Sequence, residues 1–310
     1  MSLDVTEWLA ESLIKSVRRR AYMPANDASY SDDVILDIIN EELRDYVVPV
    51  IRRVNEEHLI ARYTFASVSG QDWYKLPPRC SGEAVKFVEV QQTADGDYIP
   101  LPRLEPEKAL RIGWGYWLED DRLYIQPTPQ SALNYRLRYF YRPGRVVLST
   151  RYATVLSVHT VTNRITVTGA SAFVNDSGGS TPLDWVSGQP GFRLISGDIA
   201  TQIEVSGAGI FDGIDSTLPL LAYGDFACFA GESPTPQVPV ECWPLLAQQV
   251  AVKMLEGRGG SNYQMALDAL DKQEGRTIDL LKPRTQAGSR YVHNFNSPGW
   301  RFRGRPRTYR

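Results

Sequence analysis

One stretch near the N-terminus limits what this chain can fold into: residues 31–59, SDDVILDIINEELRDYVVPVIRRVNEEHL. Its apolar residues recur at three- to four-residue steps, which predicts one continuous apolar stripe on a helix about 40 Å long. Ser31 suits the N-cap, because a serine hydroxyl accepts a hydrogen bond from a free amide of the first turn. Pro49 removes a backbone donor, so we expect a bend near Asp45. Such a helix requires apolar partners elsewhere in the chain.

Those partners are available only at the two ends of the chain. Residues 6–22 carry an apolar face and predict a first helix. Helical periodicity returns at Val240, is interrupted by GRGGS at 257–261, and resumes to about residue 282. We therefore predict one helical bundle built from residues 1–60 and 240–282.

Between the two helical ends the apolar period changes to two, which is typical of strands. RYTFASV and DWYKLP, separated by a Ser-Gly-Gln turn, suggest a hairpin, and EAVKFVEVQ, DDRLYIQP and NYRLRYFYRPG predict further strands. No strand alternates with a helix here, so residues 61–145 are expected to form a β-rich domain without parallel βαβ units.

A second β unit follows at residues 146–232, with a hairpin expected around Thr162-Asn163. Short strand candidates and dense Gly and Ser favour a small barrel or sandwich inserted into the first fold. The proline-rich run 233–239 is expected to be a stiff connector. The predicted fold class is α+β: a helical bundle from both chain ends, a central β-rich domain carrying an inserted small β barrel or sandwich, and an extended C-terminal arm at 283–310.

The sequence gives little support for catalysis or metal binding. His58, His159 and His293 lie in three different units, and three cysteines without CxxC spacing indicate neither a zinc site nor a disulfide framework. P-loop and GxSxG motifs are absent. The acidic clusters Glu41-Glu42, Glu56-Glu57 and Glu119-Asp120-Asp121 fit solvated helix sides and a turn better than acid–base pairs. We predict a non-enzyme without cofactor or metal, and no apolar run reaches the ~20 residues that span a bilayer.

One strand in the β-rich domain combines arginine with aromatic residues. Alternation puts Arg136, Arg138 and Arg142 on one face with Phe140, and it puts Leu137, Tyr139 and Tyr141 on the other. A platform for single-stranded nucleic acid would use such residues, and so would a strand that packs against a neighbouring subunit. We favour packing.

The strongest functional signal lies in residues 283–310. No acidic residue follows Asp279, whereas Lys282 and seven arginines do, so this end carries a charge of +8 and the rest of the chain −10. Five large aromatics alternate with the arginines, a combination that anchors protein interfaces but that nucleic-acid-binding tails share. We favour docking on a protein. The expected contact residues are Arg284, Arg290, Tyr291, Phe295, Trp300, Arg301, Phe302, Arg303, Arg305 and Tyr309.

Two segments of the sequence carry a resemblance to a known family. In NEELRDYVVPVIRRVNEEHLIARYTFASVSGQDWYKLPPR an amphipathic helix runs into a strand, a Gly-Gln turn and a YxLP segment, and a C-terminal helix ends in LLKPRTQAGSRYVHN before an arm. Over residues 25–100 and 240–295 this arrangement resembles the head-to-tail adaptor, or connector, proteins of tailed bacteriophages.

The resemblance implies a structural virion protein that forms a ring beneath the capsid portal, commonly of twelve copies, assembled in the bacterial host cytoplasm. It implies a helical bundle near the portal and an arm that reaches into the portal or a neighbouring subunit. The β part would face a tail or nozzle protein, and DNA would pass through the lumen without sequence recognition and without any membrane contact. The unit at 146–232 is larger than in compact members of that family.

Two other classes of function stay open at this point. The inserted β unit could grip a glycan through Trp114, Trp117 or Trp185, as an enzyme or a carbohydrate-binding module would. Alternatively the basic tail could make the chain a nucleic-acid-binding protein, whose affinity would fall steeply with salt.

Overall fold

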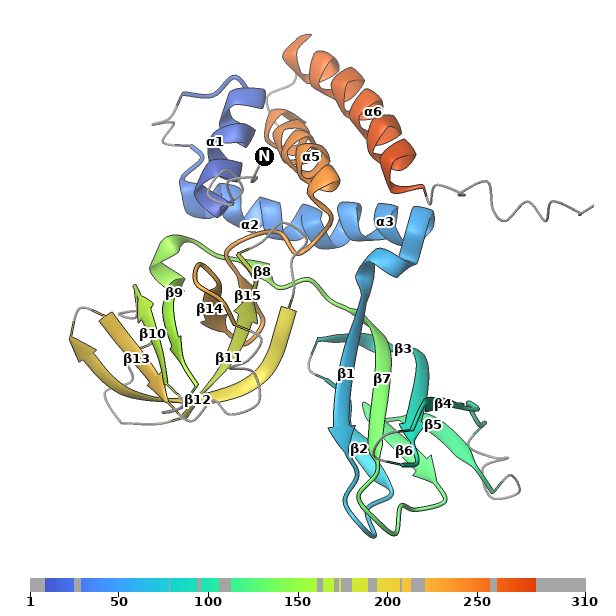
Figure 1. Cartoon of the computed structure of the whole chain (residues 1–310). Helices are drawn as coiled ribbons and strands as arrows, with labels where there is room; N and C mark the ends of the chain where they lie inside the picture. Colours follow the sequence, from blue (N-terminus) through green and yellow to red (C-terminus); the bar gives the residue numbers. More distant parts are fainter. Residues whose placement is uncertain are drawn as a thin grey trace, which may run out of the picture.

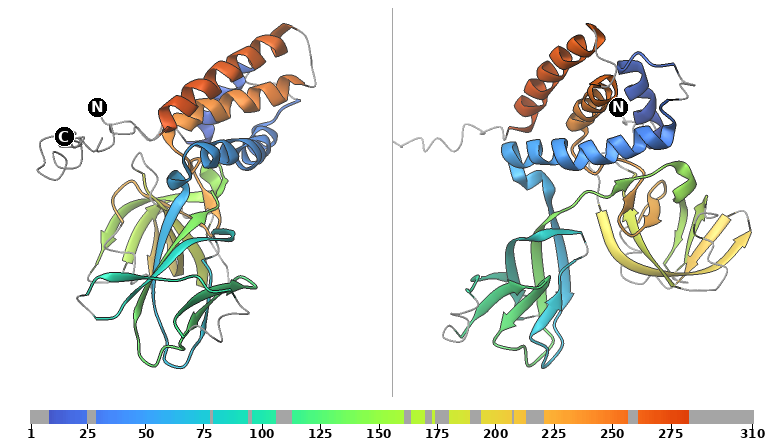
Figure 2. Two further views of the ribbon diagram at one scale, coloured as in Figure 1. Left: turned by 90° about the vertical axis from the view of Figure 1, so that its right-hand side faces the viewer. Right: turned by 180° about the vertical axis from the view of Figure 1, so that it is seen from behind.

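The fold is mixed α+β, with helices at one end of the molecule and two separate β units at the other (Figures 1 and 2). The computed structural model describes residues 9–282 apart from 25–28, 78, 94–95, 106–112, 161–163, 170–172, 174–179, 189–193, 207, 213–220 and 257–260. Helices from the two chain ends together with antiparallel sheets from the middle of the chain confirm the predicted α+β class.

Helices from the two ends of the chain pack on one another. They are α1 (Ala10–Arg20), α2 (Asp32–Glu42) and α3 (Val48–Asn55) from the first end, and α5 (Trp243–Glu256) and α6 (Ser261–Leu281) from the second. Both α1 and α2 contact α5, and α3 contacts α6. The apolar stripe of the long helix is buried in that contact, because Ile35, Ile39 and Val250 are all 0% exposed in one core. Gln249 of α5 also donates to the Glu42 carboxylate at 2.7 Å.

The long helix near the N-terminus contains a short segment of a different helix type in its middle. The Ser31 hydroxyl accepts from the amide of Val34 at 3.4 Å, which confirms the predicted N-cap. Residues Leu43–Val47 form a π-helical turn between α2 and α3, just before Pro49 in the first turn of α3. The bend predicted near Asp45 is wrong: a π turn stands there, and α2 and α3 line up across it as one rod (Figure 1).

The first β unit contains two antiparallel sheets. The four-stranded sheet has the order β1 (Ile60–Ala66), β7 (Asn134–Tyr141), β3 (Cys80–Gln91) and β4 (Tyr98–Leu101). The three-stranded sheet has the order β2 (Trp73–Lys75), β6 (Arg122–Gln126) and β5 (Gly115–Glu119).

The hairpin predicted from RYTFASV and DWYKLP is wrong, because β1 pairs with β7 and β2 pairs with β6. The Tyr74 ring lies between the two sheets, with centroids 4.9 Å from Phe65 and 6.5 Å from Tyr135. Separating the strands buries this aromatic cluster, which a two-stranded hairpin could not do.

The second β unit is a six-stranded closed barrel with pairing order β10-β13-β12-β11-β14-β9. Its strands are β9 (Tyr152–His159), β10 (Arg164–Thr168), β11 (Ser180–Val186), β12 (Leu194–Ser206), β13 (Ala208–Asp212) and β14 (Phe226–Phe229). The antiparallel β9–β10 pair confirms the hairpin predicted around Thr162-Asn163. The segments that lead into the barrel and out of it lie side by side. They are β8 (Arg145–Val146) and β15 (Glu232–Ser233), which pair in parallel.

The buried apolar residues of the described chain form three cores. The large core runs from the helices into both sheets of the first β unit and includes Leu246, Leu137 and Leu123. The barrel core is built around Trp185 and Ile165.

The third and smallest core lies at the edge of the barrel. It joins Val186 and Phe226 of the barrel to Val147, and Leu9 packs against it. The barrel is therefore held to the rest of the molecule by this apolar cluster and by polar contacts at its edge.

Candidate interaction surfaces

The arm that the sequence singled out begins where α6 is fixed to α3. All ten predicted contact residues lie within 283–310, outside the described residues. The Glu274 carboxylate of α6 accepts from the Tyr46 hydroxyl at 2.7 Å and from Arg53 at 2.9 Å. The described chain ends at Lys282, directly after α6, and the C-terminal end of α6 lies near the α3 end of the rod (Figure 1).

Strand β7 shows the two faces predicted from its sequence. Leu137, Tyr139 and Tyr141 are buried, whereas the alternate side chains are partly exposed. Arg136 pairs with Glu89 and lies 4.0 Å from the Tyr98 ring centroid. The exposed face of β7 is thus built from intramolecular arginine–aromatic contacts, which hold the side chains in place before any partner arrives.

Arg138 and Phe140 continue this arrangement toward the helices. The Arg138 guanidinium lies 4.9 Å from the Phe87 ring centroid. Arg52 of α3 lies 5.6 Å from the ring centroid of Phe140. The arginine–aromatic face therefore runs from β7 onto the end of the rod.

A buried charged pair joins the barrel to the first β unit. Arg79, just before β3, donates through Nε to Asp184 of β11 at 2.9 Å and through Nη2 to the same carboxylate oxygen. Their side chains are 6% and 3% exposed. Arg79 also donates to Gln237 at 2.7 Å, and the amide of Gly231 donates to Asp184 at 2.7 Å. Gly144 leaves room for this cluster, because a Cβ there would lie 2.5 Å from Arg79 Nη1.

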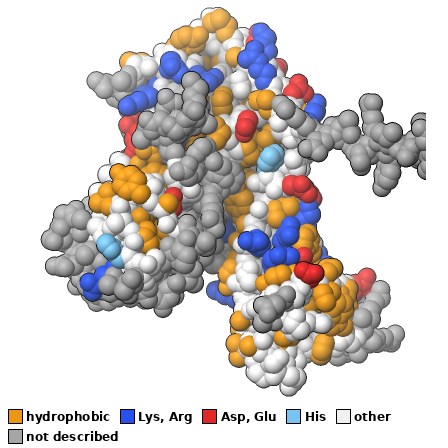
Figure 3. Space-filling view, viewed as in Figure 1, with side chains coloured by type: hydrophobic (Ala, Val, Ile, Leu, Met, Phe, Trp, Pro, Cys, Tyr) orange, Lys and Arg blue, Asp and Glu red, His pale blue; other side chains and the backbone are white. Residues whose placement is uncertain are grey.

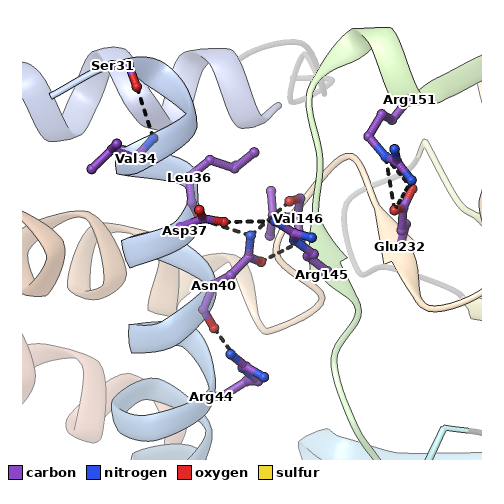
Figure 4. A network of polar contacts seen from close by, with 10 residues as sticks. All are labelled: Ser31, Val34, Leu36, Asp37, Asn40, Arg44, Arg145, Val146, Arg151 and Glu232. Atoms are coloured by element: carbon purple, nitrogen blue, oxygen red, sulfur yellow. Dashed lines mark hydrogen bonds and ion pairs between the residues drawn. The ribbon is translucent and has the colours of Figure 1, made fainter. Parts of the chain in front are cut away.

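A second polar contact joins the rod to the start of the barrel (Figure 4). The buried Asn40 side chain accepts from the amide of Val146 at 2.6 Å and donates to its carbonyl at 3.0 Å. On the exposed side Arg145 pairs with Asp37 at 2.8 Å. Since both backbone groups of Val146 are satisfied by one side chain of α2, the barrel has a fixed position beneath the rod.

The family model described as "SU10 adaptor protein" matches residues 10–163. The chain belongs to the SU10 adaptor protein family. The match covers α1 through the start of the β9–β10 hairpin, so it includes the rod and both sheets of the first β unit. It agrees with the first of the two segments on which the resemblance rests and does not extend to residues 240–295. No curated protein matches the sequence.

Membership of this family makes the adaptor a bacteriophage structural protein and a component of the virion. A structural adaptor family also favours a non-enzyme. No helix in the described part of the adaptor is long and apolar enough to cross a membrane.

The tryptophans considered for glycan binding do not form one site in the adaptor. Trp185 is 0% exposed in the barrel core, so its proposed role in gripping a glycan is wrong. Trp114 is 39% exposed and lies just before β5, outside the barrel. Trp117 of β5 stacks on Tyr124 of β6 at 5.0 Å between ring centroids, with an interplanar angle of 7°. Its ring face is therefore occupied by a neighbour in the same sheet.

The titratable groups of the adaptor fit structural roles. Burial raises the pKa of the Cys80 thiol to about 11 and that of Cys242 to about 12, and it raises the pKa of Cys228 well above the ordinary value. All three cysteines are free. Over the described residues no group of three or more His, Cys, Asp and Glu side chains could hold a metal ion. Protonated thiols are poor nucleophiles and poor metal ligands.

Apart from Glu42, which is buried, the acidic clusters and the described histidines occupy the positions expected for surface groups. His58 and His159 are exposed, whereas His293 lies outside the described residues. Lys86 lies 3.6 Å from Glu56 and 3.4 Å from Glu57. The turn between β5 and β6 contains Asp120 and Asp121 at positive φ, as the sequence predicted for a tight turn. Within 41–42, Glu41 is exposed and Glu42 is buried, with Gln249 as its partner.

Proposed function

We propose that this adaptor forms a ring between the capsid portal and the tail of a bacteriophage particle. The observation that carries the proposal is the family match over the rod and the first β unit. The helices at one end and two β units at the other give each copy two distinct ends (Figure 2). The helical end would face the portal, and the β units would face a tail or nozzle protein. Twelve copies would surround a lumen through which DNA passes without sequence recognition.

Residues 283–310 would dock on the portal or on a neighbouring copy. Their arginines would pair with acidic partner groups, and their five aromatic side chains would become buried. Ordering the arm on docking costs conformational entropy, which the buried aromatics and paired arginines offset. Because α6 is tied to α3 through Glu274, every copy would present its arm from the same point. Assembly would take place in the host cytoplasm and give a virion component.

The first experiment is a mass measurement of the full chain by light scattering, with and without the portal of the same particle, followed by imaging. We expect a symmetric ring on the portal. A monomer throughout, with no association with the portal, would refute the ring.

The second experiment tests the arm. Deleting residues 283–310 should abolish portal binding while leaving the far-UV circular dichroism of the remaining chain unchanged. Replacing Trp300 and Phe302 by alanine should weaken binding at least tenfold, since each interface aromatic contributes roughly 2 kcal/mol. Trp114→Ala is the matched control, because Trp114 is an exposed tryptophan outside the arm. Equal portal affinity of the arm variant and the control would contradict arm docking.

A further inference from the structure

The rod formed by α2 and α3 is acidic in its first half and basic at its far end. Helix α2 contains five carboxylates and no basic residue, whereas α3 contains two arginines and no acid. Exposed carboxylates recur at every fourth position, which places them along one side of the rod. This acidic strip consists of Asp33, Asp37, Glu41 and Asp45.

The acidic strip is electrostatically unfavourable in an isolated copy. Like charges four residues apart on a helix destabilise it by about 0.2–0.5 kcal/mol per pair. Within the described residues only Asp37 of the strip has an ion pair, with Arg145. Arg44 donates through Nε to the carbonyl of Asn40, and Lys253 of α5, which lies near Glu41, pairs with Glu256. The strip therefore retains an excess of negative charge.

The far end of the rod carries the opposite excess. Arg62 of β1 and Arg138 of β7 are directly opposite each other in the antiparallel pair, an arrangement that destabilises a sheet when the charges are alike. Arg52 lies beside them over Phe140. We call Arg52, Arg62 and Arg138 the basic face, and Figure 3 shows Lys and Arg side chains gathered over the upper parts of β1 and β7.

The basic face is poorly neutralised within its own chain. Across the described residues no carboxylate pairs with Arg52 or Arg62. The carboxylate nearest Arg138 is that of Glu89 at 4.0 Å, and Glu89 already pairs with Arg136. Arginines held over aromatic rings are typical of protein interfaces.

We infer that the acidic strip of one copy docks against the basic face of the next copy in the ring. The acidic strip lies along α2 and the π turn, whereas the basic face lies on α3 and on β1 and β7, which extend from the α3 end of the rod (Figure 1). Placing copies head to tail brings opposite charges together and relieves the repulsion within each surface. A nucleic acid would neutralise the basic face alone and would leave the acidic strip unpaired. This contact rests on the proposed ring and identifies the surfaces that close it.

The test reverses the charge of each surface in a separate variant and then mixes the two variants. Arg62→Glu with Arg138→Glu should raise the concentration needed for assembly on the portal at least tenfold, and so should Asp33→Lys with Glu41→Lys, because each places like charges in contact. At the concentration at which the wild type assembles, neither double variant should assemble alone. An equal mixture of the two should assemble at that concentration. In such a ring the altered face of the arginine variant meets the altered strip of the other variant, and the two unaltered surfaces meet at the next contact. Raising the salt concentration to about 1 M should weaken the wild-type ring.

Two matched double variants control for charge reversal as such. Lys75→Glu with Arg122→Glu changes the exposed three-stranded sheet, and Asp268→Lys with Asp271→Lys changes the exposed side of α6. Both are expected to assemble like the wild type. All variants are checked for unchanged far-UV circular dichroism.

The outcomes separate the contact from the ring itself. A wild-type ring that forms equally well with both reversed surfaces overturns the contact but leaves the ring in place. An arginine variant that assembles normally but loses affinity for duplex DNA assigns the basic face to nucleic acid instead. If the wild type forms no ring with the portal, the proposed function fails first and the contact fails with it.

Discussion

Asp184→Ala tests whether a buried ion pair holds the barrel against the first β unit. Asp184 accepts two hydrogen bonds from Arg79 and one from the amide of Gly231. The substitution leaves the Arg79 guanidinium buried with two remaining acceptors, the Gln237 side chain and the Glu232 carbonyl. The apolar cluster at this edge, which includes Val147, Val186 and Phe226, stays in place, so the substitution removes only the charged part of the contact.

The expected loss in the free energy of unfolding follows from the burial of both side chains, Arg79 and Asp184. Removing one partner of a buried ion pair costs about 3–5 kcal/mol because it leaves an uncompensated charge. We expect the lower end, about 3 kcal/mol, since Arg79 keeps two acceptors. Replacing both Arg79 and Asp184 by leucine should recover more than half of this loss, because no charge then remains buried.

The assay is urea unfolding of Asp184→Ala and of the double leucine variant, with amide hydrogen exchange of β11 as a local readout. Arg151→Ala is the control, because the Arg151–Glu232 pair lies at the same edge but its arginine side chain is 55% exposed (Figure 4). An exposed pair contributes about 0–1 kcal/mol. If Asp184→Ala costs no more than Arg151→Ala, the pair does not hold the barrel and the reasoning is wrong.

Three further predictions follow from the contacts of single side chains. Asn40→Ala should lower the free energy of unfolding by about 2–3 kcal/mol in urea titrations, since it leaves both backbone groups of Val146 unpaired in a buried position. Tyr46 has its pKa raised above the ordinary 10.0 by burial and by its hydrogen bond to Glu274, so its contribution to stability is complete below pH 10 and falls as the pH rises above it. Thermal unfolding from pH 8 to 11 should therefore decline less steeply in Tyr46→Phe than in the wild type; parallel curves would argue against this. Cys228 and Cys242 should react with a thiol reagent at pH 7.5 only after unfolding, and fast labelling of the native chain would contradict their burial.

Local patterns in the sequence were sufficient for most of the elements. The spacing of apolar residues predicts the rod and the helices at the C-terminal end, and a serine before two aspartates predicts the cap at Ser31. Alternation along β7 separates buried Leu137 and Tyr139 from the arginine side. These predictions succeed because helix and strand periods depend on backbone geometry that each segment has by itself. The sequence also predicts the adaptor family, from the helix-to-strand segment that the family model covers.

Pairings between distant segments were decided only by the tertiary structure. The period of two predicts a strand at β1 but does not identify its neighbour, and so the predicted hairpin with β2 is wrong. In the same way Trp185 was considered for a glycan site although it fills the barrel core.

The acidic strip could be read from the sequence, whereas the opposition of Arg62 and Arg138 and the burial of Arg79 beside Asp184 could not. Arg79 and Asp184 are 105 residues apart in the chain, and nothing local to either one indicates the other. The sequence by itself determines which residues share a face of an element, because that follows from the local backbone period. Which faces meet depends on the path of the whole chain, since the free energy of burying a charge or an aromatic ring depends on what the fold brings against it.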